Sequence, residues 1–269
     1  MADRLKYKRK LVSNEIIRRQ RDHKKLRRRV FYVSLVVFVN VVFFSLVFLV
    51  LLKIRNITTE GNQRYSAEQI IEALPVEKGD NMYNFFTADV ENTVKSELPY
   101  ITSLEITRKL PSTLELSVVE KNASMYIELN SEYFLLSEDL LVLEMTGNRE
   151  MVNQLPELVS TNIKKCVVGK YIVFRDEATL DVLKILNKTI ISNFESGRIT
   201  EVDVSSRFDI WLRYENRFII YLGDIQNCDL KIRFLGKIID ELYEDQSGRI
   251  DVSNIARGSF KEGVLEKTT

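Results

Sequence analysis

The residue types that most often carry catalytic or metal chemistry are scarce in this chain of 269 residues. Its only histidine, His23, lies in a basic N-terminal stretch, and its two cysteines, Cys166 and Cys228, lie far apart and outside any C-x-x-C spacing. Residues 53–269 therefore hold no Ser-His-Asp or Cys-His nucleophile and no zinc site that uses histidine. The two cysteines either form a disulfide in an oxidising compartment or serve as small buried apolar side chains.

Other enzymatic chemistry has no sequence pattern that fixes it. Serine, lysine, aspartate and glutamate are abundant, so a Ser-Lys dyad or a carboxylate pair remains open, but no spacing singles one out. The chain also lacks the G-x-x-x-x-G-K-[ST] phosphate loop and the G-x-G-x-x-G turn of nucleotide-binding proteins. We therefore expect a protein that is not an enzyme, with no catalytic residues, no cofactor and no metal site.

The longest apolar segment runs from Val30 to Leu52 and contains no charged residue, glycine or proline. As a helix it would be roughly 34 Å long, enough to cross a hydrocarbon core of about 30 Å. A buried core helix of this length would show a polar face. A signal peptide would be shorter and would end in small residues rather than in Lys53-Ile54-Arg55. The segment predicts one transmembrane helix at residues 30–52.

The charges predict how the chain crosses the membrane. Residues 1–29 contain thirteen Lys and Arg against three acidic residues, whereas the remaining chain has 26 basic and 35 acidic residues. Short basic flanks stay in the cytoplasm, so we expect a single-pass type II protein of the cell membrane, N-terminus inside and C-terminus outside. The basic tail attracts anionic lipid at about 1 kcal/mol per basic residue. It has neither stacking aromatics between its arginines nor room for a fold, so we expect no nucleic acid.

Residues 53–121 predict a small domain in which a helical layer covers a sheet. Ser66 begins the sequence Ser-Ala-Glu-Gln, a capping box with Gln69 at its third helical position. The expected order is strand, helix, helix, strand, strand. The predicted elements are Ile54–Thr59, Ser66–Leu74, Thr87–Leu98, Ile101–Arg108 and a strand through Leu114, Leu116 and Val118.

Residues 122–260 predict a second domain of mostly antiparallel strands with packed helices, followed by a polar tail at 261–269. The expected strands are Met125–Leu129, Tyr133–Ser137, Leu140–Met145, Ile199–Val204, Phe208–Tyr214, Arg217–Leu222 and Arg249–Ser253. One helix runs from Asp176 to Phe194. Another runs from Cys228 to Tyr243, and its apolar face is predicted at Leu230, Phe234, Ile238 and Leu242.

Several segments resemble those of a known family. In chain order they read I-T-T-E-G-N at Ile57–Asn62, S-A-E-Q-I at Ser66–Ile70 and R-K-L-P-S-T-L-E-L-S-V-V-E at Arg108–Glu120. Their order and spacing directly after one span resemble the FtsQ/DivIB family of bacterial cell-division proteins. Leu155–Leu158 resembles a later step of that family, and the chain departs from its pattern after Glu120. The resemblance implies an α+β fold, with a POTRA domain at 53–121 and a β-domain at 122–260.

The same resemblance implies a function without catalysis. Members of the family are scaffolds at the division septum. They bind two smaller bitopic proteins, of the FtsB/DivIC and FtsL types, and help to regulate the septal peptidoglycan synthase complex. Two alternatives remain open from the residues themselves. One is a membrane-anchored extracytoplasmic hydrolase with a Ser-Lys or carboxylate site, and the other is a single-pass sensor.

The end of the β-domain is where the resemblance places the FtsB/DivIC-type partner, which adds to the sheet. We therefore expect Ile250, Val252, Ile255 and Phe260 to bind the partner or to support its site, with Arg249–Ser253 as the last strand and the sheet's edge. The alternative is that Ile250 and Val252 face the core, because residues two apart share one side of a strand. Trp211, the only tryptophan, is either an interface aromatic or a sheltered one.

Overall fold

The computed structural model describes residues 26–267, so most of the predicted cytoplasmic tail at 1–29 lies outside the described residues. The chain divides into two compact units. The first holds the N-terminal helix as far as Thr58, together with Val76–Phe86 and Thr107–Glu115, and the second holds the rest. This division does not coincide with the boundary predicted between residues 121 and 122. The domain boundaries predicted from the sequence therefore stay a prediction.

The first unit begins with a long apolar helix. It runs over Leu26–Leu46 with a mean hydropathy of 2.1 and no buried side chains, and it continues as the π-helix η1 (Val47–Leu51). Within the described residues it is the one helix long and apolar enough to cross a membrane. The prediction of a single candidate span is therefore confirmed.

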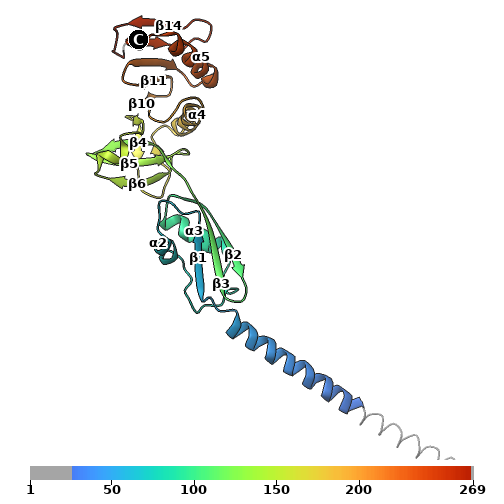
Figure 1. Cartoon of the computed structure of the whole chain (residues 1–269). Coiled ribbons are helices and arrows are strands. Elements are labelled where there is room, and N and C mark those ends of the chain that lie inside the picture. Colours follow the sequence, from blue (N-terminus) through green and yellow to red (C-terminus); the bar gives the residue numbers. More distant parts are fainter. Residues whose placement is uncertain (1–25, 268–269) are drawn as a thin grey trace, which may run out of the picture. The chain divides into compact units, whose positions relative to one another are not determined.

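A three-stranded sheet with two helices follows the apolar helix along the chain (Figure 1). Its strands lie in the order β1 (Asn56–Glu60), β3 (Thr113–Glu120) and β2 (Ile101–Lys109), and α2 (Ala67–Glu72) and α3 (Thr87–Glu97) lie between β1 and β2 in sequence. Ser66 and Gln69 form the predicted capping box at the start of α2. The predicted β-α-α-β-β order is thus confirmed.

A nine-stranded mixed sheet dominates the second unit. Its spatial order is β14-β13-β12-β11-β10-β7-β4-β5-β6. The pairs β10–β7, β4–β7 and β12–β13 are parallel, and the other pairs are antiparallel. The strands are β4 (Ala123–Leu129), β5 (Glu132–Ser137), β6 (Val142–Thr146), β7 (Glu157–Val159), β10 (Ile199–Ser206), β11 (Asp209–Tyr214), β12 (Phe218–Gly223), β13 (Gly248–Asp251) and β14 (Ser259–Glu262).

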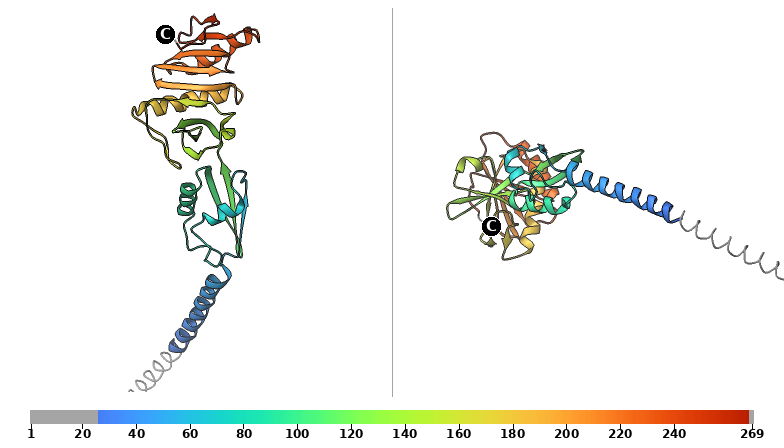
Figure 2. Two further views of the ribbon diagram at one scale, coloured as in Figure 1. Left: turned by 90° about the vertical axis from the view of Figure 1, so that its left-hand side faces the viewer. Right: turned by 90° about the horizontal axis from the view of Figure 1, so that it is seen from below.

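Two helices, α4 (Ala178–Asn193) and α5 (Cys228–Glu241), pack beside this sheet (Figure 2). Their buried residues join one apolar core with every second residue of the central strands, such as Ile210, Leu212, Ile220 and Leu222. Since side chains alternate along a strand, the residues between them face the opposite side of the sheet, which we call the outer face. A short pair, β8 (Ile163–Lys165) and β9 (Val173–Phe174), stands apart as its own sheet.

The apolar stripe predicted for the last helix is confirmed at Phe234, Ile238 and Leu242, which pack against the core, and is wrong at Leu230. Leu230 is 51% exposed, whereas the fully buried residues of α5 are Cys228, Lys231, Ile232 and Leu235. The helix can turn a lysine inward because the Lys231 ammonium donates to the Leu222 carbonyl (3.0 Å) and to the carbonyl and carboxylate of Asp224 (2.8 and 2.9 Å). A buried cation with such partners avoids the large cost of an unpaired charge.

The two cysteines are both free thiols. Cys228 is buried at the start of α5 and Cys166 is half-buried. Burial raises the pKa of the Cys166 thiol to about 11, and it also raises the pKa of Cys228. Both side chains therefore stay protonated near neutral pH and act as apolar groups.

Candidate partner-binding surface

The sheet ends at β14, one strand beyond the edge that the sequence predicts. The sequence predicts Arg249–Ser253 as the last strand, but β13 in that segment pairs with a further strand, β14. Within the described residues, no strand pairs with the other side of β14. The open edge is therefore made by Ser259–Glu262, a segment that the sequence assigns partly to the polar tail.

The predicted site residues divide between the core and this edge. Ile250 and Val252 are fully buried in the core, in agreement with the alternative that they face the core. They can therefore support a partner site only by packing beneath the edge strand, without contacting the partner themselves. Ile255 is half-buried in the connection between β13 and β14. Phe260 lies on β14 itself, opposite Ile250, and its ring packs edge-on against Phe218 at 6.0 Å between centroids.

Backbone hydrogen bonds show which groups of β14 point outward. The N–H group of Gly248 in β13 donates to the carbonyl of Arg217, just before β12 (3.0 Å), and that of Val252, just after β13, donates to the carbonyl of Tyr221 in β12 (3.0 Å). The intervening residues of β13, Arg249 and Asp251, therefore pair with β14, where Lys261 and Ser259 lie opposite them. It follows that the N–H and C=O groups of Phe260 and Glu262 point to the open edge.

Close backbone packing holds β14 in place. A Cβ atom added at Gly248 would lie 2.2 Å from the Lys261 carbonyl oxygen and 3.0 Å from the Cα atom of Glu262. At Gly258, just before β14, an added Cβ atom would lie 2.6 Å from the ring of Phe234 on α5. At Gly248 the clash would be with backbone, so only glycine allows the edge strand to approach its neighbour so closely; at Gly258 the side chains of Phe234 and Ile238 would have to shift.

An aromatic and arginine cluster lies on the outer face next to this edge. Trp211 and Tyr221 are cross-strand neighbours whose ring centroids are 4.5 Å apart. The Arg249 guanidinium lies 5.0 Å from the Trp211 ring centroid and 5.7 Å from that of Tyr221. Trp211 is only 4% exposed, so it is a sheltered residue and not an exposed interface aromatic.

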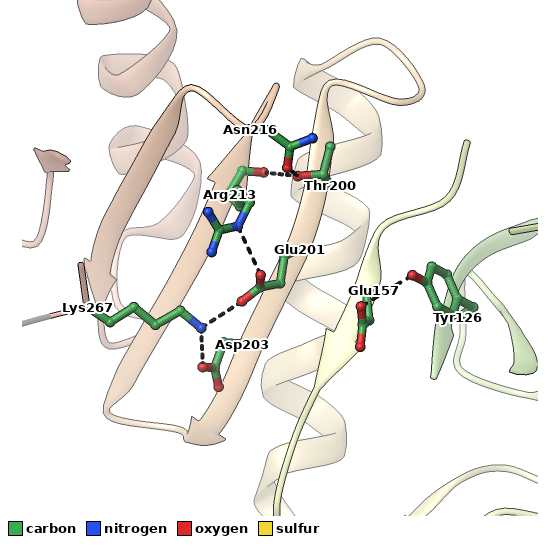
Figure 3. A network of polar contacts seen from close by, with 8 residues as sticks. All are labelled: Tyr126, Glu157, Thr200, Glu201, Asp203, Arg213, Asn216 and Lys267. Carbon is green, nitrogen blue, oxygen red and sulfur yellow. Dashed lines mark hydrogen bonds and ion pairs between the residues drawn. The ribbon is translucent and has the colours of Figure 1, made fainter. Parts of the chain in front are cut away.

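A polar network ties the segment after β14 back to the sheet (Figure 3). The Lys267 ammonium donates to the carboxylates of Glu201 and Asp203 on β10, both at 2.6 Å, and Arg213 on β11 donates to Glu201 at 3.0 Å. Since β10 is separated from β14 by three strands, the segment Gly263–Lys267 reaches from the open edge back across the width of those strands.

These contacts change the ionisation of the network. Burial, the largest single cause, would raise the pKa of Glu201 and Asp203. The hydrogen bonds and charges of Lys267 and Arg213 around Glu201, and those of Lys267 and Ser205 around Asp203, together outweigh burial, so both carboxyl pKa values lie below their ordinary range. Burial would lower the pKa of Lys267, and its two carboxylate partners raise it instead. The network is therefore fully charged near neutral pH.

We expect Lys267→Ala to lower the free energy of unfolding by roughly 0.4–2 kcal/mol near neutral pH, the range for two partly exposed ion pairs. Because the folded-state pKa of each carboxyl is lowered, the stabilisation is complete above the ordinary carboxyl pKa and is lost as pH falls below about 4. Urea unfolding of the full chain in detergent at several pH values measures the difference between the two proteins. Lys237→Ala, an exposed lysine on α5, is the control. A difference that does not shrink in acid would contradict the assignment.

Two parts of this surface are not predicted by the sequence. The tetrapeptide of β14, Ser-Phe-Lys-Glu, has one apolar residue and reads as a loop. Lys267 finds its partners 66 and 64 residues earlier in the chain, a separation for which no local pattern exists. The sequence offers one signal for this surface. In β11, Trp211 and Arg213 alternate with the apolar residues Ile210 and Leu212, which indicates that the strand has a second face carrying polar side chains.

Comparison with known proteins agrees with the resemblance seen in the sequence. Residues 52–121 match the family described as POTRA domain, FtsQ-type. The chain is 26% identical over 201 residues to cell division protein DivIB of Clostridium acetobutylicum, covering 74% of this chain and 79% of that protein. It is 25% identical over 181 residues to cell division protein FtsQ of Corynebacterium glutamicum, covering 67% of this chain and 75% of that protein.

Among solved structures, the major extracytoplasmic domain of DivIB from Geobacillus stearothermophilus aligns with 46% of this chain and 99% of its own, at 13% identity and a TM-score of 0.29. The family model and the relatives confirm the resemblance to the FtsQ/DivIB family.

Proposed function

We propose that this chain is a membrane-anchored, non-enzymatic scaffold of the bacterial cell-division machinery. Its DivIB and FtsQ relatives support a role in division, and the candidate span supports attachment to the membrane. In this proposal residues 1–29 stay in the cytoplasm, one helix crosses the membrane, and residues 53–269 work outside it at the septum. The uneven charge of the sequence supports this orientation.

The open edge of β14 is the observation that carries the proposal. An extended segment of a partner adds to such an edge as a further strand, and the main-chain hydrogen bonds supply affinity without a distinctive side-chain motif. Phe260 and Glu262 offer the outward-facing main-chain groups. Ile250 and Val252 support the edge from the core, and Ile255 borders it.

The partner types come from the family resemblance. A bitopic protein of the FtsB/DivIC type occupies the edge of β14, and one of the FtsL type joins the same assembly. Through them the scaffold helps to regulate the septal peptidoglycan synthase complex. The chain itself supplies position and binding in this scheme, with no catalytic step.

We expect Glu262→Pro to weaken capture of the FtsB/DivIC-type partner by about ten-fold, because proline removes an outward N–H and its ring obstructs an added strand. The matched control is Glu262→Ala, which keeps the N–H group. Both variants should unfold at nearly the same urea concentration as the unchanged chain, since this N–H does not pair with β13. Affinity purification from detergent extracts, with mass spectrometry of the bound proteins, measures the effect.

If the Glu262→Pro protein captures the FtsB/DivIC-type partner normally, the partner does not bind at the edge of β14. Equal loss in Glu262→Pro and Glu262→Ala would assign the binding to the side chain and not to the main chain. Recovery of no division protein by the unchanged chain would remove the scaffold function itself.

A further inference from the structure

A second surface, far in sequence from β14, carries exposed aromatic side chains that the proposed function does not use. It consists of the loop Asn81–Phe86 and the hairpin residue Leu110, and we call it the aromatic loop surface. Phe86 is 79% exposed, Leu110 65% and Tyr83 48%. Single exposed apolar residues are ordinary, but these belong to two segments of the same compact unit as the apolar helix.

Hydrogen bonds tie the loop directly to the end of the apolar helix. The Met82 N–H donates to the Leu52 carbonyl at 2.9 Å, and the Asn81 side-chain amide donates to the Phe48 carbonyl at 2.6 Å. Lys53 and Asn81 form an isolated antiparallel bridge. The backbone of the loop therefore lies one hydrogen bond from the last residue of the uncharged apolar run.

Arg108 holds the loop and the hairpin together. Its guanidinium donates to the carbonyls of Met82 (2.6 Å) and Phe85 (3.2 Å). It also lies 5.3 Å from the ring centroid of Tyr83 and 5.0 Å from that of Phe85. Leu110 follows two residues later at the turn of the hairpin. These contacts fix the loop while leaving the rings of Tyr83 and Phe86 largely in solvent, so the exposure is built into the fold.

The depth of this surface points to lipid as its occupant. The polar layer of a bilayer adds about 5–8 Å on each side of the hydrocarbon core. A loop bonded to the last residue of the span falls within that layer, where aromatic side chains are enriched and apolar groups sink roughly 5–10 Å into the boundary. The exposed Lys53 and Arg55 next to it suit the lipid phosphates.

We infer that the aromatic loop surface is a membrane-interface anchor, in which Tyr83, Phe86 and Leu110 insert into the head-group layer of the leaflet where the span ends. This inference rests on the membrane attachment in the proposed function. It adds a second point of contact with the bilayer, so the first unit is held at a set depth and orientation on the membrane. The occupant is lipid and not a protein partner, because the surface continues directly from the span.

Depth-dependent fluorescence quenching tests the inference on the full chain in vesicles of phosphatidylcholine and phosphatidylglycerol. Trp211→Phe removes the only native tryptophan, and single tryptophans are then introduced by Phe86→Trp, Val119→Trp or Phe44→Trp. Val119 is an exposed residue of β3 outside the loop, and Phe44 lies within the span. The acyl chains carry bromine either near the head group or near the chain ends.

We expect the Phe86→Trp protein to lose most fluorescence with bromine near the head group. The Phe44→Trp protein should respond most to bromine near the chain ends, and the Val119→Trp protein to neither. If Phe86→Trp behaves like Val119→Trp while Phe44→Trp is quenched, the anchor is overturned and the span stands; the exposed rings then face water or a protein. If Phe44→Trp is not quenched either, the span and the anchor both fall.

Discussion

Gly248→Ala is expected to detach the edge strand β14 and to abolish capture of a division partner. The added methyl group would lie 2.2 Å from the carbonyl oxygen of Lys261, an atom of the backbone that cannot rotate away. Since β13 is held by β12 on its other side, β14 must move. We expect the free energy of unfolding to fall by about 1–3 kcal/mol, as for other overpacked sites.

Hydrogen exchange of the full chain in detergent measures the first effect directly. The amides of Ser259 and Lys261, which pair with β13, should exchange faster in Gly248→Ala, while those of the central strands keep most of their protection. Affinity purification measures the second effect, on the partner. Gly236→Ala is the matched control, because nothing lies near an added Cβ atom at that position of α5. In a helix this change should stabilise by roughly 0.4–1 kcal/mol.

A Gly248→Ala protein with unchanged exchange at β14 would show that the strand accommodates the methyl group. Loss of β14 protection with normal partner capture would separate the edge from the binding site. The combination of both losses, absent from Gly236→Ala, is the result that the proposed docking mode requires.

Leu116→Ala is expected to have the largest effect on stability in the three-stranded sheet. Leu116 lies in the middle of β3 and is fully buried. Truncating a buried leucine removes its apolar contacts and leaves a cavity, which costs about 2–5 kcal/mol. The measurement is the opening free energy of the β2 and β3 amides by hydrogen exchange in the full chain.

The control for Leu116→Ala lies three residues further along the same strand. Val119 is 56% exposed on the other side of β3, so Val119→Ala should change the opening free energy by less than about 0.5 kcal/mol. Equal effects of the two substitutions would show that the inward and outward sides of β3 are misassigned.

The sequence predicts those parts of the fold in which local pattern and burial agree. The capping box at Ser66 and the strand alternation through Leu114 and Leu116 both place their residues correctly. In these segments the local sequence pattern agrees with the burial seen in the structure, so the pattern alone is enough to predict the element and its buried side.

Prediction fails where the structure depends on contacts distant in sequence. The buried side of α5 includes Lys231. A pattern of apolar residues excludes a lysine from the core, because the pattern contains no information on its hydrogen-bond partners at Leu222 and Asp224. The sequence predicts the open edge one strand too early, since β14 has a single apolar residue and edge strands are often short and charged. Ile250 and Val252 were placed correctly on one side of a strand, and that side proved to face the core.

The position of β7 in the middle of the large sheet has a mechanical consequence. β7 has only three residues, and it meets β4 at a single register pair, Tyr126 opposite Glu157. One backbone bond from Tyr126 to Pro156 (3.0 Å) and one from the Tyr126 hydroxyl to the Glu157 carboxylate (3.3 Å) reinforce this junction. A pulling force applied at β14 and resisted at β6 passes through this junction and through α4, where the Asn187 amide donates to the Ser124 hydroxyl (2.9 Å) and the Glu138 carbonyl (3.0 Å). Under tension, we expect the sheet to part first between β4 and β7, so that β7 and the five strands from β10 to β14 separate together as one block.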